Sequence, residues 1–364
     1  MKLVLKIKIL PTAEQRLLLL QTMEEANKAC AYISDVAWVN KTFGKFNIQH
    51  LCYEDVRKRF NLSAQMVIRC VSKVADAYKL DHDKKREFRT YGSICYDSRI
   101  LSYKGNEVSI WAIGKRQKIP FVCHNKEYIS YIKGEADLIY KKGKFYLYQT
   151  IDVPESDEKV SDTIVGLDFG ITDIVCTSEG KTYSSKALNE YRERRLKIRG
   201  SIQSKGTRGC KKLLKRLSGR EKTTATIINH TISKQIVSDA QKRGVGLAIE
   251  DLRKIRKTAK RRNKTFRSKL NRWNFGQLRD FLTYKCALSG VQLIVVEPAY
   301  TSQTCSLCHH IGVRNGKSFK CMNCRNDMDA DINAARNIAL LGVVVNQPEK
   351  SDMYSCFLHR TIQI

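Results

Sequence analysis

The chain has 364 residues, 42 % of them hydrophobic, a composition that excludes a disordered protein and suffices for two or three domains. Its 66 lysines and arginines outnumber 36 aspartates and glutamates, so the formal net charge is +30. A charge excess of this size repels itself strongly, and it indicates a polyanionic partner rather than a merely solvated basic surface.

The N-terminus predicts a strand rather than a targeting segment. Residues 2–10 alternate lysine with aliphatic side chains, which is typical of a β-strand and unlike a signal peptide. No apolar run approaches the roughly 18 residues of a membrane span. Thirteen cysteines without any mark of secretion fit a reducing compartment. We therefore expect a cytoplasmic protein.

Two blocks follow the first strand. Thr12 and Gln15 form a capping box that starts a helix after Pro11, and helical spacing continues to about residue 80. From Ser93 to Val153 the pattern changes to β, with Lys142-Gly143 as a hairpin turn. The strands expected in this block are Val108–Trp111, Ile119–Val122, Ile129–Ile132 and Lys144–Asp152. The first strand and this block predict one small barrel with the helices inserted.

Beyond a polar linker at residues 154–159, the pattern becomes α/β and includes candidate catalytic carboxylates. Residues 164–170 read as a buried strand that ends in Asp168 and a glycine turn, and a second apolar strand ends in Glu250. Asp331 lies in the first turn of a later helix. If the strands are neighbours, three such carboxylates can hold two Mg²⁺ or Mn²⁺ ions, the hard cations that hydrolyse phosphodiesters.

Each carboxylate has an ordinary alternative. Asp168 could be only a turn residue, and Asp251 could replace Glu250 as the ligand. Asp331 could be only a helix N-cap, a role for which Asp329 competes. The order of the three acidic segments in the chain is a stronger signal than any one of them.

Two basic segments flank the second carboxylate. Residues 192–216 predict a hairpin of two long amphipathic helices, although an ordinary solvated helix face remains an alternative for them. Residues 253–272 contain eleven Lys or Arg and no acidic residue, which predicts phosphate binding. On the helix expected over 224–241, His230 is a packing or phosphate-contacting residue rather than a general base. Trp111 and Trp273 could stack on bases, but core packing is the commoner role. The candidate nucleic-acid-binding residues are Lys211, Lys212, Arg216, Lys254, Arg256, Lys257, Lys260, Arg261 and Arg262.

Two CxxC pairs precede the helix of Asp331. Four thiolates at Cys305, Cys308, Cys321 and Cys324, with twelve residues between the pairs, predict a structural tetrahedral Zn²⁺ site closed around a short hairpin. Such a ribbon is a compact metal-bound module that often contacts nucleic acid.

These segments resemble the RuvC-like nuclease and zinc-ribbon signature of the transposon-encoded TnpB (OrfB) family, relatives of type V CRISPR effector nucleases. The resemblance also includes the segments around Gln15 and Arg99, and it extends to about residue 345. The matching segments are Gly166–Gly170, Ile249–Leu252, Tyr300–Cys308, Cys321–Cys324 and Asp331–Ile338.

The resemblance implies a multi-domain fold that combines α/β and all-β parts. It implies a wedge β-barrel (1–10 and 81–155) with an inserted helical recognition domain (11–80). It further implies an RNase H-like RuvC nuclease domain (161–300 and 326–345) with an inserted zinc ribbon (301–325), and residues 346–364 follow as a disordered tail.

The implied activity is RNA-guided, Mg²⁺- or Mn²⁺-dependent cleavage of double-stranded target DNA next to a short flanking motif, with Asp168, Glu250 and Asp331 as the catalytic triad. We expect a monomer bound to a transposon-derived guide RNA. A CRISPR effector that uses a CRISPR RNA, a non-cleaving RNA-guided repressor and a guide-independent transposase accessory are the alternatives.

Overall fold

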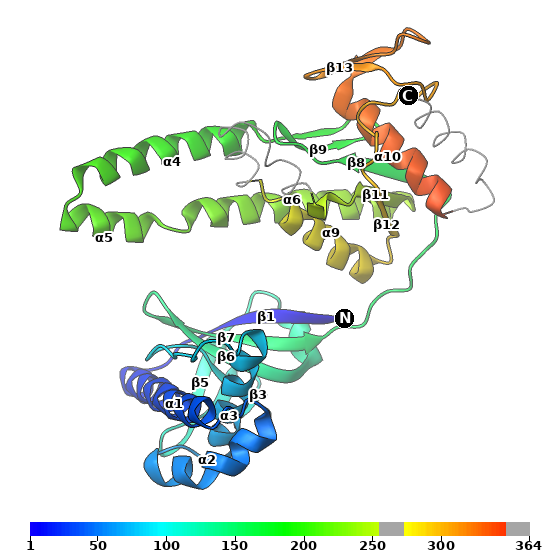
Figure 1. Cartoon of the computed structure of the whole chain (residues 1–364). Coiled ribbons are helices and arrows are strands. Elements are labelled where there is room, and N and C mark those ends of the chain that lie inside the picture. The colour runs from blue at the N-terminus through cyan, green and yellow to red at the C-terminus, as the bar shows by residue number, and fades with distance from the viewer. Residues whose placement is uncertain (255–272, 347–364) are drawn as a thin grey trace. The chain divides into compact units, whose positions relative to one another are not determined.

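The boundary between the two units of the chain falls directly after Pro154, where the polar linker was predicted. The computed structural model describes residues 1–254 and 273–346. The units are Met1–Pro154 and Glu155–Ile364, and each is described by itself (Figure 1).

The helical block of the first unit consists of α1 (Ala13–Val39), α2 (Lys45–Arg59) and α3 (Ala64–Leu80). The predicted capping box is present, because the Thr12 Oγ1 accepts from the Gln15 backbone N–H at 3.3 Å and the Gln15 Oε1 accepts from the Thr12 N–H at 3.1 Å. The buried faces of the helices pack against one another through apolar residues that include Met23, Ile33, Ile48, Val67 and Val74.

The strands of the first unit form a seven-stranded sheet in the order β2-β6-β7-β1-β5-β4-β3. The first strand lies inside the sheet, between β7 and β5, which confirms that it belongs to the later β block. The Tyr96 hydroxyl of β2 donates to the Trp111 carbonyl of β4 at 3.0 Å, so the sheet curls its two ends toward each other. The strands are β1 (Lys2–Ile9), β2 (Ile94–Tyr96), β3 (Leu101–Lys104), β4 (Glu107–Ala112), β5 (Lys115–Val122), β6 (Ile132–Lys141) and β7 (Lys144–Asp152).

One predicted strand is wrong. Residues Lys126–Tyr131 form a 3₁₀ helix, and β6 begins only at Ile132. The segment contains β-forming side chains, but none of its residues is buried, so no core contact favours extended pairing. The hairpin turn at Lys142-Gly143 is as predicted, with φ of 52° and 76° at its two residues.

The second unit is built on a five-stranded sheet in the order β10-β9-β8-β11-β12. The central strands β8 (Ile164–Asp168) and β11 (Gly246–Glu250) are parallel neighbours, and β12 (Leu293–Val296) is parallel to β11. The strands β9 (Asp173–Thr177) and β10 (Thr182–Ser184) extend the sheet antiparallel. Parallel β8 and β11 end at the same edge, which places the carboxylates that end them side by side.

Helices cover both faces of this sheet. The helices α6 (Arg220–Arg243) and α9 (Phe275–Ser289) pack on one face, over a core that includes Leu167, Ile236 and Leu282. The helix α10 (Ala330–Asn346) packs on the other face through Ile338 and Leu341. The predicted hairpin of two long helices is only partly right: α4 (Lys186–Lys205) is long, but α5 (Arg208–Leu217) is short because the chain breaks at Ser218-Gly219 before α6.

A three-stranded ribbon, with β13 (Val313–Asn315), β14 (Ser318–Lys320) and β15 (Asp327–Asp329), precedes α10. The hairpin of β13 and β14 lies between the two CxxC pairs along the chain, as predicted. Gly166 brings α10 against β8: a Cβ there would lie 1.9 Å from the Ala335 carbonyl oxygen and 2.5 Å from the Ala339 nitrogen. The contact between helix backbone and strand backbone therefore requires glycine at this position.

Candidate metal centres and nucleic-acid surfaces

Asp168 and Glu250 lie at one edge of the sheet of the second unit. The parallel register pairs Leu167 with Ile249, and the next residue of each strand is the carboxylate. Both side chains therefore emerge at the carboxyl ends of neighbouring strands, where open α/β sheets commonly form sites. Asp168 is not a mere turn residue, since it ends β8 and is half-buried.

Asp331 reaches the same place from the first turn of α10. Asp329 caps this helix, because its Oδ1 accepts from the backbone N–H of Asp331 at 2.8 Å and of Ile332 at 3.1 Å. Asp331 is therefore not needed as the cap, and its carboxylate interacts elsewhere. The close seating of α10 on Gly166 brings this first turn near the end of β8.

Glu250 and Asp331 lie close enough to Asp168 to perturb its pKa. Burial raises the pKa of Asp168 to about 7, and the negative charges of Glu250 and Asp331 add to that rise. Burial also raises the pKa of Glu250, against a hydrogen bond from the Thr301 hydroxyl and the charge of Arg314. The cluster therefore concentrates negative charge that a cation would stabilise.

Arg314 and Lys317, on the hairpin of the ribbon, lie against this acidic cluster. The Arg314 Nη2 donates to the Asp331 Oδ1 at 2.7 Å, and its charge also lowers the pKa values of Asp168 and Glu250. The Lys317 ammonium pairs with Asp173 and lies 3.8 Å from the Asp331 Oδ2. Sequence reasoning missed both cations. Their position between the CxxC pairs is only a weak signal, because the sequence does not show that this hairpin lies against the sheet edge.

Asp251, the alternative to Glu250, faces different partners. Its carboxylate accepts from the Arg253 backbone and side chain and lies 3.6 Å from the Arg279 Nη1. The hydrogen bonds from Arg253 hold the pKa of Asp251 down to about 2. The structure therefore groups Glu250, and not Asp251, with Asp168 and Asp331.

Buried asparagines of α10 hold the loop that supports Glu250. The Asn337 Nδ2 donates to the carbonyls of Thr301 and Thr304 at 2.8 and 2.7 Å, and the Asn333 Nδ2 donates to Thr304 at 2.7 Å. Both asparagines are fully buried. Since Thr301 bonds the Glu250 carboxylate, α10 both supplies Asp331 and positions the partner of Glu250.

The four predicted cysteine ligands meet at one point. Their sulfurs lie within 4.8 Å of one another, with Cys305–Cys324 at 3.6 Å and Cys308–Cys321 at 3.4 Å. Burial raises the pKa of Cys308, but the His310 backbone N–H, Asn323 and the neighbouring cysteines outweigh it and lower that pKa to about 5. The Asn326 backbone N–H lowers the pKa of Cys324, but hydrogen bonds with the other cysteines and burial outweigh it and raise that pKa to about 12. The four sulfurs are a ligand set that a metal ion would bind as thiolates.

The candidate basic residues divide between described and undescribed parts of the chain. Lys211, Lys212 and Arg216 are exposed along α5. Arg256, Lys257, Lys260, Arg261 and Arg262 lie outside the described residues, as do the side chain of Lys254 and the predicted tail after residue 346.

His230 packs as expected. Its ring stacks on Phe281, with centroids 3.7 Å apart, and burial together with the charge of Lys285 lowers its pKa. Within the described residues, no helix is long and apolar enough to cross a membrane.

Comparisons with known proteins identify the family. The family description "Cas12f1-like, TNB domain" matches residues 275–338, which include α9, the four cysteines and the start of α10. The TnpB-like protein MJ0751 of Methanocaldococcus jannaschii is 34 % identical over 189 residues, covering 50 % of this chain and 68 % of that protein. The chain belongs to the TnpB-like family.

More distant relatives include CRISPR-associated nucleases. The CRISPR-associated endodeoxyribonuclease Cas12f1 of Sulfoacidibacillus thermotolerans is 32 % identical over 222 residues, and the alignment covers 55 % of this chain and 51 % of that protein. The chain thus spans about half the length of this relative. The cryo-EM structure of the Cas12f1-sgRNA-target DNA complex matches 90 % of this chain and 83 % of that chain, with a TM-score of 0.59 and 15 % identity. At that identity, the likeness shows a shared fold.

Proposed function

We propose that this chain is an RNA-guided DNA endonuclease that hydrolyses target DNA at the cluster of Asp168, Glu250 and Asp331. The observation that carries the proposal is the placement of three carboxylates from β8, β11 and α10 at one sheet edge, where Glu250 and Asp331 add to the raised pKa of Asp168, in a chain of net charge +30. A nucleic-acid-binding protein gains nothing from acidic groups facing its ligand unless a cation joins them. One relative is named a CRISPR-associated endodeoxyribonuclease, which supports the proposal.

The carboxylates fit the hard divalent cations that the family implies. Their oxygens are the ligands that Mg²⁺ and Mn²⁺ prefer, and burial together with the charges of Glu250 and Asp331 disfavours the ionised form of Asp168 unless a cation joins it. When bound, such ions supply an activated water and stabilise the leaving oxygen of the phosphodiester. Asp168, Glu250 and Asp331 would hold them in an RuvC-like, RNase H-related core.

Other residues of the site orient the carboxylates and place positive charge beside them. Thr301 fixes the Glu250 carboxylate by hydrogen bonding, and Asn337 holds Thr301 in turn. Arg314 places a guanidinium at the edge of the cluster, where it can donate to a phosphate oxygen whose negative charge grows during hydrolysis.

We propose Zn²⁺ as the metal of the four cysteines. A tetrahedral site with Zn–S bonds of about 2.3 Å requires sulfurs about 3.8 Å apart, which is close to the measured separations of 3.4 and 3.6 Å. The site has four protein ligands and no open position, so its role is structural. It holds the hairpin that presents Arg314 and Lys317 to the carboxylates.

The guide RNA and the target DNA are the proposed polyanionic partners. Base pairing with the guide would read the sequence, while the protein would bind backbones and a short flanking motif. A CRISPR RNA as guide would leave the chemistry unchanged. Discrete RNA that copurifies with the protein would distinguish a guided nuclease from a guide-independent transposase accessory.

Single substitutions at the three carboxylates, with a neighbouring aspartate as the control, test the site. Asp168→Ala, Glu250→Gln and Asp331→Ala should each abolish cleavage of guide-matched DNA while guide and target binding persist. Asp251→Asn is the matched control and should still cleave, because its carboxylate faces Arg253 and Arg279. Near wild-type cleavage by any of the first three variants would remove that residue from the site, and retained target binding by all three excludes a loss of fold.

A further inference from the structure

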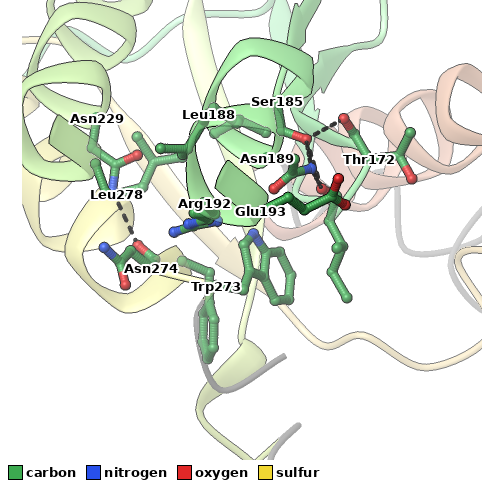
Figure 2. A pocket seen from close by; sticks show the side chains of 15 residues that line it. Thr172, Ser185, Leu188, Asn189, Arg192, Glu193, Asn229, Trp273, Asn274 and Leu278 are labelled. Atoms are coloured by element: carbon green, nitrogen blue, oxygen red, sulfur yellow. Dashed lines mark hydrogen bonds between the residues drawn. The ribbon is translucent and has the colours of Figure 1, made fainter. Parts of the chain in front are cut away.

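A cavity of about 280 Å³ lies in the second unit, on the opposite face of the sheet from α10 (Figure 2). Side chains alternate along β8: Leu167 and Phe169 face the core under α6 and α9, whereas Gly166 contacts α10. The cavity is lined by members of that first core, namely Leu188, Ala225, Trp273, Phe275 and Leu278. It is thus separate from the carboxylate cluster, although it belongs to the same sheet.

The loop after Asp168 forms part of the cavity wall. Gly170, Ile171 and Thr172 line it, and Gly170 follows Asp168 by two residues. Two residues span at most about 7 Å of chain, which is close to the length of one extended nucleotide. The cavity wall therefore begins within one nucleotide length of the residue that ends β8.

Two asparagines present hydrogen-bond acceptors at the cavity wall. The Asn189 Nδ2 donates to the Ser185 Oγ at 2.6 Å and the Ile171 carbonyl at 3.3 Å, and the Asn229 Nδ2 donates to the Asn274 carbonyl at 3.2 Å and the Gln277 Oε1 at 3.3 Å. Both N–H groups of each amide are thus used. In the described part of the chain, neither Oδ1 accepts a hydrogen bond from the protein.

The rest of the wall suits a flat, partly polar group. Trp273, which is 8 % exposed and packs on Phe275 with ring centroids 4.8 Å apart, supplies the aromatic part of the wall. Arg192, which pairs with Glu221 at 3.3 Å, brings a guanidinium from α4. Figure 2 shows the Trp273 indole next to Arg192 and Glu193. Apolar walls with a few convergent polar groups are typical of small-ligand sites, and the volume lies at the small end of their range.

We propose that this cavity binds one nucleobase bearing an exocyclic amino group, from the unpaired DNA strand that enters the carboxylate site. The inference rests on the proposed nuclease function. Trp273 would contact the base ring, and the amide oxygen of Asn229 would accept from its amino group. Cytosine, adenine and guanine carry such a group, whereas thymine and uracil have only carbonyl oxygens, which would face that acceptor without a proton between them.

Tryptophan fluorescence offers a direct test on the full-length chain. Of the three tryptophans, Trp38 and Trp111 lie in the first unit and can be replaced by phenylalanine, which leaves Trp273 as the only reporter. The probes are oligodeoxycytidine and oligodeoxyuridine of equal length, which differ in the amino group. Titrations are made without added Mg²⁺ or Mn²⁺, so no cleavage contributes to the signal and the cysteine site keeps its metal.

We expect oligodeoxycytidine to quench Trp273 and to bind about tenfold more tightly than oligodeoxyuridine, the worth of one well-formed hydrogen bond. Asn229→Leu should bring the two affinities together. The matched control, Gln235→Leu, removes a carboxamide from the exposed face of α6 and should leave the preference intact. Equal quenching by both probes, or no quenching by either, would overturn the proposal.

The probe comparison stands even if Asn229→Leu fails to fold, because it uses the unaltered cavity. Cleavage of guide-matched DNA is assayed separately with Mg²⁺. An inactive protein that still prefers deoxycytidine would refute the nuclease function alone. An active protein without the preference would refute the base site alone.

Discussion

Asp168→Asn should stabilise the metal-free protein at neutral and alkaline pH, although it should abolish cleavage. Asp168 has a pKa of about 7 in the folded chain, against 3.8 as its ordinary value, because burial and the charges of Glu250 and Asp331 disfavour its ionised form. An unfolded chain exposes the carboxylate to water and ionises it near the ordinary value. Folding at pH 8 therefore includes the cost of ionising Asp168 in place.

The magnitude follows from linkage. Below pH 3.8 Asp168 is protonated in both the folded and the unfolded chain, so the cost is absent. Between pH 3.8 and 7 it ionises only in the unfolded chain, so the free energy of unfolding falls as pH rises. Above pH 7 this loss of stability is complete. A difference of roughly three pKa units corresponds to about 4 kcal/mol at pH 8, and to about 2 kcal/mol at pH 5. Asparagine has nearly the same shape and no charge, so the variant avoids the cost of ionising residue 168 at either pH.

Urea unfolding without added Mg²⁺ or Mn²⁺ at pH 5 and pH 8 measures this difference, with Trp273 in the Trp38→Phe, Trp111→Phe background as the reporter of the second unit. Mg²⁺ should reverse the order at pH 8 by stabilising the parent protein more than the variant. Asp251→Asn should act oppositely, since Asp251 has a pKa lowered to about 2 and contributes stability above its ordinary pKa. A stability gain in Asp168→Asn that is absent or independent of pH would refute the reasoning.

Three further outcomes follow from the structure. Gly166→Ala should force α10 off β8, which should destabilise the second unit by about 1–3 kcal/mol or more and weaken Mn²⁺ binding. Gly276→Ala, at a site with open space, should change neither stability nor Mn²⁺ binding, and calorimetry of both variants checks this. Cys305→Ser should lose the single Zn²⁺ expected from elemental analysis and unfold the ribbon, while Cys210→Ser on α5 keeps both. Replacing Lys211, Lys212 and Arg216 together by Gln should weaken binding to all DNA sequences alike and flatten its salt dependence, and an unchanged slope of affinity against salt concentration would remove α5 from the nucleic-acid surface.

The sequence alone predicted the features that depend on neighbours along the chain. The capping box of Thr12 and Gln15 is closed by residues three apart, and the CxxC pairs bring two sulfurs together within one turn of chain. The strands that end in Asp168 and Glu250 were evident because a buried parallel strand reads as a short apolar run. The segment at Ile129–Ile132 failed because its β-forming side chains are exposed, and only buried pairing partners would have kept them extended.

Only the tertiary structure decided which charges meet. The parallel register of β8 and β11 and the seating of α10 on Gly166 set the distances among Asp168, Glu250 and Asp331. The same packing brings Arg314 from the ribbon to these carboxylates. Asp329 caps α10, which leaves Asp331 to join the carboxylates, and the sequence had left open which of the two is the cap. Spacing along a chain constrains a side chain within a turn or two, whereas its charge interacts with whatever the fold places beside it.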